Sequence, residues 1–76
     1  MHSKIEYLEL LIESPEGVTS SEVEEDWDDV TRDAARKALF RLFKHGCAER
    51  IKEGEYRYQI TDRGIEKYHH LTRDET

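Results

Sequence analysis

The chain has 76 residues and a mass of 9.0 kDa, which is enough for a single small domain and excludes a second hydrophobic core. No apolar run approaches the roughly 18 residues of a membrane span, and the first residues lack the apolar stretch of a secretory signal. A domain of this size encloses at most a small pocket, so we expect neither an enzyme nor a cofactor. The net charge of −6 predicts repulsion from nucleic acid at long range.

The charge is unevenly distributed along the chain. Residues 16–29 hold seven acids and no base, whereas residues 30–52 hold seven bases against Asp33 and Glu49. The middle third is therefore basic enough to face a phosphate backbone, although the whole chain is acidic. The acidity has two candidate causes: a protein partner, or adaptation to high salt, where carboxylates keep a surface hydrated.

The first predicted element is a helix over residues 4–13, capped by Ser3. Its apolar side chains recur at helical spacing, at Ile5, Leu8, Leu11 and Ile12. The sequence Ser14-Pro15-Glu16-Gly17 ends it, because proline disfavours helical geometry in the preceding residue and glycine suits a turn. Val18 then leaves room for a very short strand.

Two capped helices follow. In Thr19-Ser20-Ser21-Glu22 the threonine and the glutamate can satisfy each other's backbone amides, which predicts a short helix through Trp27 with Val23 and Trp27 buried. Thr31 caps the next helix, residues 32–45, and Gly46 suits the left-handed conformation that ends it. The inward stripe of that helix is expected at Ala35, Ala38, Leu39 and Leu42.

Two strands and a last helix complete the chain. Residues 48–53 and 56–60 are expected to pair around the turn Glu53-Gly54-Glu55. Tyr56 and Tyr58 then share one strand face, where they cover the core or support the hairpin. Thr61 caps a helix over residues 62–71, which places Ile65 and Tyr68 inward.

This order of elements resembles the winged helix-turn-helix fold of small transcription regulators of prokaryotic or archaeal type. The resemblance covers residues 4–71, the part of the single domain that we expect to be ordered. It rests on Thr19-x-x-Glu22-Val23, Val30-Thr31, Leu39-x-x-Leu42-x-x-x-Gly46 and Tyr58-Gln59-Ile60-Thr61-Asp62-Arg63-Gly64. It implies an α+β fold in which the helix of residues 32–45 enters the major groove of DNA and the hairpin touches the backbone.

The resemblance also implies which residues bind DNA: Thr31, Arg32, Asp33, Arg36, Lys37, Arg41, Lys44, Lys52 and Arg57. Those at the start of the helix would read base edges, and the later bases would contact phosphates. Asp33 would either accept from a cytosine amine or pair with Arg36 or Lys37. The plain alternative is a solvated helix face. The turn Glu53-Gly54-Glu55 departs from the basic hairpin tip of a minor-groove reader, so the hairpin is expected on the backbone.

Apolar residues outside the core stripes indicate possible protein contacts. Phe40 and Phe43 either pack against the first helix or the hairpin, or form a surface for a protein partner. A second apolar edge, formed by Tyr7, Leu10, Leu11, Tyr68 and Leu71, predicts a homodimer. The rival function is therefore a protein-interaction module of the same fold that docks through Phe40, Phe43 and the acidic second helix and does not bind DNA.

The cysteine and the histidines indicate no metal site. Cys47 alone cannot form an internal disulfide, and small domains of oxidising compartments usually carry several, so we expect a cytoplasmic protein. Cys47 is interpreted as a small core residue, with a redox role as the alternative. His2, His45, His69 and His70 match no metal-ligand spacing.

Overall fold

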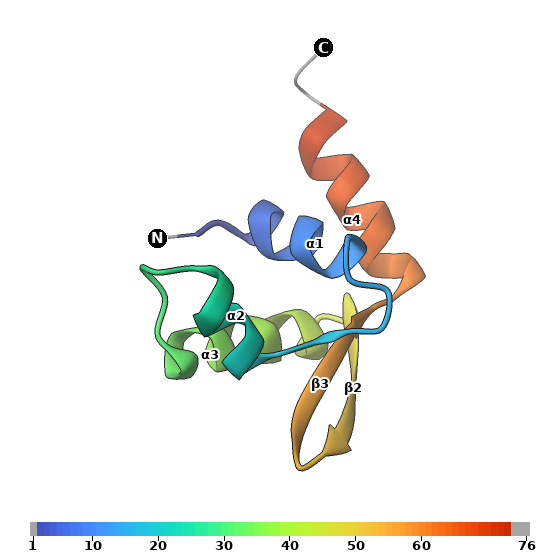
Figure 1. Ribbon diagram of the computed structural model, residues 1–76. Coiled ribbons are helices and arrows are strands. Elements are labelled where there is room, and N and C mark those ends of the chain that lie inside the picture. Colours follow the sequence, from blue (N-terminus) through green and yellow to red (C-terminus); the bar gives the residue numbers. More distant parts are fainter. Residues whose placement is uncertain (1, 74–76) are drawn as a thin grey trace.

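The computed structural model describes residues 2–73; residue 1 and residues 74–76, which the expected domain includes, lie outside the described part. Within it, helices and a small antiparallel sheet form the α+β fold that the sequence predicts (Figure 1). The elements are α1 (Lys4–Ile12), β1 (Val18–Thr19), α2 (Ser20–Asp26), α3 (Arg32–Lys44), β2 (Ala48–Glu53), β3 (Glu55–Ile60) and α4 (Asp62–Thr72). None of the described helices is long and apolar enough to cross a membrane.

The sheet has the strand order β1-β3-β2, so β3 lies in the middle and pairs antiparallel on both edges. β2 and β3 form the expected hairpin, with Gly54 at the turn. β1 contributes two residues, with Val18 opposite Tyr58. The hairpin projects beyond the helices beside α3, and α1 and α4 lie together at the other end of the molecule (Figure 1). This layout is compatible with a winged helix.

A hydroxyl side chain begins each described helix. The side chains of Ser3, Thr19, Thr31 and Thr61 each accept a hydrogen bond from a backbone N–H in the first turn. The Glu22 carboxylate in turn accepts a hydrogen bond from the Thr19 amide. This reciprocal pair confirms the predicted capping box. Glu6 does the same for Ser3, a second box with the same spacing. Each N-cap stabilises its helix by about 0.5–2 kcal/mol.

The hydrophobic core forms where α1 packs against α4 and β3 and where α2 and β2 pack against α3. The expected inward stripe of α3 is confirmed: Ala35, Leu39 and Leu42 are buried and Ala38 packs partly against them. Cys47 is buried in the same cluster, as a small core residue.

The buried face of α1 is wider than the sequence predicts. Tyr7, Leu8 and Leu11 are buried, whereas Ile5 and Ile12 are only partly buried. The reason is that α1 is covered on more than one side, by α4, by β3 and by α3. Helical spacing identifies the existence of an apolar stripe but not how many neighbours will cover it.

This packing corrects the predicted dimer interface. Tyr7 and Leu11 are 5% and 0% exposed, so placing them in an interface was wrong: they belong to the core of their own chain. Leu10, Tyr68 and Leu71 are partly buried and pack against the same core. The Tyr68 hydroxyl also donates to a Glu9 carboxylate oxygen at 2.9 Å, which ties α4 to α1.

A tight turn after α3 also supports the start of α4. Gly46 has a φ of +77°, and the Gly46 and Cys47 amides donate to carbonyls in the last turn of α3, as in a Schellman motif. The Thr61 hydroxyl donates to the Gly46 carbonyl at 2.7 Å, and its amide donates to the Cys47 carbonyl at 3.1 Å. Gly64 lies so close to this turn that an added Cβ would stand 2.2 Å from the Cys47 oxygen.

The substitution Gly64→Ala has two opposite effects on stability, a favourable one through helix propensity and an unfavourable one through a steric clash. Alanine is favoured over glycine inside a helix by about 1 kcal/mol, but its methyl group would collide with the Cys47 carbonyl. We expect the free energy of unfolding in urea to fall by about 1–3 kcal/mol. Ala34→Gly, at an exposed position of α3, is the matched control because it changes propensity alone. A Gly64→Ala protein more stable than the parent would contradict the close approach.

His2 fastens the segment before α1 to the turn after α2. Its ring stacks on Trp27, with centroids 3.7 Å apart and planes inclined by 13°. Its Nε2 lies 2.8 Å from an Asp29 oxygen, and its Nδ1 lies 3.0 Å from a Glu6 oxygen. The hydrogen bond to Asp29, assisted by that to Glu6, raises the pKa of His2 above its ordinary value of 6.5. Trp27 is therefore half-buried between His2 and Tyr7, whose ring meets it edge-on at 4.8 Å.

Trp27 fluorescence should report the protonation of His2. Because the pKa of His2 is raised on folding, its stabilising contribution is complete below pH 6.5 and is lost as the pH rises through the folded-state value. We expect a fluorescence transition with its midpoint above pH 6.5, since Trp27 is the only tryptophan. His2→Gln should abolish the transition; an unchanged midpoint in that variant would assign it to another group.

Candidate nucleic-acid interface

Basic and aromatic side chains from α3 and the hairpin meet on one surface. Arg50 is the register partner of Tyr58 and Lys52 that of Tyr56, so these four side chains lie on one side of the hairpin. A shallow pocket of about 290 Å³ is lined there by Arg36, Lys37, Phe40, Arg50, Tyr56 and Tyr58. We define the α3–hairpin face as Arg36, Lys37, Phe40, Phe43, Lys44, Arg50, Lys52 and Tyr56.

Arg50 joins the helix to the hairpin through three aromatic rings. Its guanidinium carbon lies 4.1 Å from the ring centroid of Tyr56, 4.4 Å from that of Phe43 and 5.4 Å from that of Phe40. A guanidinium over an aromatic face is attracted by the ring quadrupole and keeps its N–H groups for other acceptors. Arg50 was not among the expected DNA-binding residues, yet it stands at the centre of the face.

The same contacts show where the side chains of Phe40 and Phe43 lie. Phe43 is half-buried against the core, and Phe40 is 39% exposed with its ring 6.0 Å from that of Phe43. Both rings turn toward the hairpin through Arg50. Lys44 and Lys52 lie at the rim, each with its ammonium 5.9 Å from a ring centroid, Phe40 and Tyr56 respectively. The face is thus an aromatic floor bordered by bases.

Asp33 neutralises part of the basic charge at the start of α3. Its carboxylate accepts a hydrogen bond from Arg36 and pairs with the Lys37 ammonium at 3.2 Å. The hydrogen bond from Arg36, followed by that from Lys37, lowers the pKa of Asp33 and keeps the carboxylate charged. The pairing alternative for Asp33 is therefore present in the unbound protein. A nucleic acid that binds Arg36 and Lys37 must compete with Asp33.

The remaining expected contacts on α3 lie at the edges of the face. The Thr31 hydroxyl caps the helix by accepting the Ala34 N–H at 3.1 Å. The Arg32 amide donates to a Glu24 carboxylate oxygen at 3.1 Å, and its exposed side chain lines a hollow toward α2. Arg41 is exposed one turn beyond Lys37, outside the pocket.

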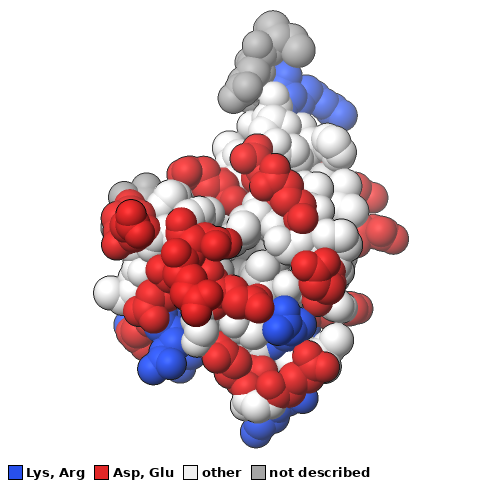
Figure 2. Space-filling model, in the orientation of Figure 1, with Lys and Arg blue, Asp and Glu red and all other residues white. Residues whose placement is uncertain are grey.

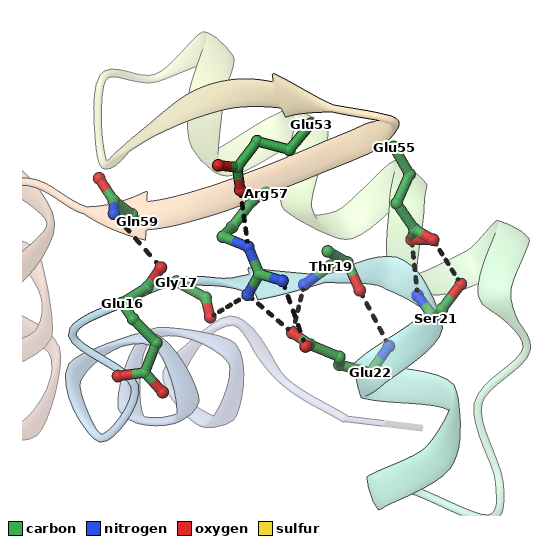
Figure 3. Close-up of polar contacts among 9 residues, drawn as sticks. All are labelled: Glu16, Gly17, Thr19, Ser21, Glu22, Glu53, Glu55, Arg57 and Gln59. Carbon is green, nitrogen blue, oxygen red and sulfur yellow. Dashed lines mark hydrogen bonds and ion pairs between the residues drawn. The ribbon is translucent and has the colours of Figure 1, made fainter.

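Arg57 does not belong to the α3–hairpin face, although it was expected to bind the DNA backbone. It lies on the opposite side of β3 and donates to the Gly17 carbonyl at 3.0 Å (Figure 3). The same guanidinium forms ion pairs with Glu22 at 3.2 Å and Glu53 at 3.3 Å. The bond to Glu22, above all, raises the pKa of Arg57. The structure therefore gives Arg57 an internal role, that of tying the hairpin to α2 and β1.

The acidic hairpin tip has the same kind of role. The Glu55 carboxylate accepts from the Ser21 hydroxyl at 2.8 Å and from the Ser21 amide at 3.3 Å (Figure 3). The hydroxyl bond, followed by the amide bond, lowers the pKa of Glu55. Gln59 adds a bond from its amide to the Glu16 carbonyl at 3.3 Å. Glutamate thus stands at the tip because it holds the hairpin to the N-terminal end of α2.

The alternation of side chains along each strand is the sequence signal that assigns a residue to one side of the hairpin or to the other. Residues of even number, such as Arg50 and Tyr56, face α3, and residues of odd number, such as Glu55 and Arg57, face α2 and the turn before β1. Counting alternate positions from the tip would have placed Arg57 with the glutamates. The tertiary partners on each side are not visible in the sequence.

Many acidic side chains lie away from the α3–hairpin face. Figure 2 shows many of them over the part of the molecule that carries α1 and α2, and others over the hairpin and beside α4, while most of the few bases in this view lie near α3 and the hairpin. Of the acids in residues 16–29, four belong to α2, and one of them, Glu24, lines the same hollow as Arg36 of the α3–hairpin face. The molecule carries a pronounced charge asymmetry, which orients it toward a charged partner.

No group of three or more potential ligands in residues 2–73 could hold a metal ion. The chain matches no protein-family model, no curated protein and no solved structure. The function is therefore inferred from the residues and their geometry.

Proposed function

We propose that the protein is a winged-helix transcription regulator that binds double-stranded DNA, with α3 in the major groove and the hairpin against the backbone. The observation that carries the proposal is the α3–hairpin face, where five bases from two elements surround an aromatic floor in a chain of net charge −6. If these side chains served only solubility, the positive charges of an acidic chain would not need to be concentrated in one area.

The dimensions of α3 suit this role. Its thirteen residues give a length of about 20 Å and present an exposed side that fits the ~12 Å wide major groove. Arg36 and Lys37 lie where the N-terminal part of a recognition helix meets base edges, and a guanidinium can donate to both O6 and N7 of guanine. Lys44, Arg50 and Lys52 border them and suit phosphate oxygens.

The rival proposal is a protein-interaction module of the same fold. It is favoured by the acidic surface over α1 and α2 and by the exposed ring of Phe40. The ring contacts of Arg50 reduce the apolar area that Phe40 and Phe43 offer to a partner. For this reason we place DNA binding first.

A homodimer remains a prediction, with a smaller interface than the sequence indicated. Since Tyr7 and Leu11 are buried, only Leu10, Tyr68 and Leu71 of the expected edge keep exposed surface. Two copies would allow two half-sites about one DNA turn apart to be read together.

The test is a titration of random duplex DNA at several salt concentrations, followed by fluorescence anisotropy. If Lys44, Arg50 and Lys52 meet phosphates, the logarithm of the association constant should fall with that of the salt concentration with a slope of about −2.7. The slope would reach about −4.5 if Arg36 and Lys37 also met phosphates. A slope near zero, or no binding at low salt by the folded protein, would favour the protein-interaction module.

Asp33→Asn should strengthen DNA binding, because it releases Arg36 and Lys37 from their ion pairs. The matched control is Asp28→Asn, which removes the same charge from an exposed position in the turn before α3. We expect tighter binding at low salt for Asp33→Asn than for Asp28→Asn, with identical circular dichroism. Equal gains in the two variants would mean that only net charge matters and that Asp33 does not compete with DNA.

A further inference from the structure

A second basic surface lies on the other flank of α3, away from the hairpin. Here the start of α1, the end of α3 and one side of α4 enclose an open hollow of about 730 Å³. Its lining is Lys4, Leu42, His45, Cys47, Arg63, Glu66, Lys67, His69, His70 and Arg73. None of these residues belongs to the α3–hairpin face. The volume lies within the range of sites that hold small molecules.

The charge of this hollow is opposite to that of the chain. Four lysine or arginine side chains line it against the single carboxylate of Glu66, although acids outnumber bases by 18 to 12 in the whole sequence. Three imidazoles, of His45, His69 and His70, stand among them and offer further N–H donors. Such a concentration of like charge raises the local positive potential and attracts anions.

Ion pairs within residues 2–73 do not neutralise all of this charge. There, no carboxylate forms an ion pair with Lys4, Arg63 or Lys67. Arg36 and Arg57 differ in this respect, since Arg36 shares Asp33 with Lys37 and Arg57 pairs with Glu22. The N–H groups of Lys4, Arg63 and Lys67 are therefore left for an external acceptor.

The floor and one wall of the hollow are fixed by the core. Leu42 and Cys47 line it and are 3% and 5% exposed, so they add a narrow apolar part to its lining that the core holds in place. Arg63 lies across the turn after α3: a Cβ added at Gly46 would stand 3.3 Å from the Arg63 Cδ atom. Its guanidinium lies beside this turn, with Nε and Nη1 at 3.7 and 3.8 Å from the same Cβ position.

We propose that this hollow binds an organic polyphosphate, such as a nucleoside triphosphate. The phosphate oxygens accept from Arg63, Lys67 and Lys4, because arginine and lysine are the usual donors to phosphate. The organic part of the ligand rests on Leu42 and Cys47. A concave basic hollow with an apolar floor suits a small anion of this kind better than a rod of duplex DNA, which needs a long exposed face.

The test is calorimetric titration of the intact protein with ATP, tripolyphosphate and adenosine at constant ionic strength. We expect ATP to bind more tightly than tripolyphosphate, and adenosine to give no measurable heat. Equal affinity for ATP and tripolyphosphate would overturn the role of the apolar floor. Binding of adenosine as tight as that of ATP, or no binding of ATP at millimolar concentration, would overturn the anion site.

A pair of double variants locates the site. Arg63→Gln with Lys67→Gln should weaken ATP binding by at least about tenfold, since two charge-assisted contacts are lost. Lys37→Gln with Arg41→Gln removes the same charge from the exposed side of α3 and should leave ATP binding unchanged. Equal losses of ATP affinity in the two double variants would show that ATP responds only to the overall charge of the protein. This result would overturn the proposal. Because the first pair leaves the α3–hairpin face intact, its duplex binding should persist, which separates this test from that of DNA binding.

Discussion

The hairpin keeps its place because β3 is hydrogen-bonded on both edges, to β2 and to β1. Alternation along this central strand sends Tyr56 and Tyr58 toward α3 and sends Glu55 and Arg57 toward α2 and the turn before β1. One side therefore builds the α3–hairpin face, and the other fastens the hairpin to the N-terminal half of the chain. A shift of the register by one residue would exchange the two sets and destroy both surfaces.

The charges are used in two different ways on the two sides of the hairpin. Glu53 forms an ion pair with Arg57, and Glu55 accepts a hydrogen bond from Ser21. Both carboxylates of the hairpin tip therefore have partners within the chain. Arg50 rests on aromatic rings, which hold its position without neutralising its charge. An acidic protein can in this way keep a compact basic surface, because its carboxylates are held elsewhere by the fold.

α3 stands between the two basic surfaces and connects them physically. Its side nearest the hairpin contributes Phe40 and Phe43, and its last turn contributes Leu42 to the floor of the hollow beside α4. The turn that ends α3 also receives α4, through the Thr61 bonds and the close approach of Gly64. A ligand in the hollow would thus lie against the last turn of the helix that is proposed to read DNA.

Local rules in the sequence determined the elements: the caps at Thr19, Thr31 and Thr61, the glycine after α3 and the hairpin around Gly54 were all predictable, because each depends on neighbours within a few residues. The basic character of α3 was also visible. Only the tertiary structure decided that Tyr7 and Leu11 are buried, that Arg57 holds α2 and that Arg50 joins the face on α3. The physical reason is that burial and ion pairing depend on which elements meet, and spacing along one element specifies only its own faces.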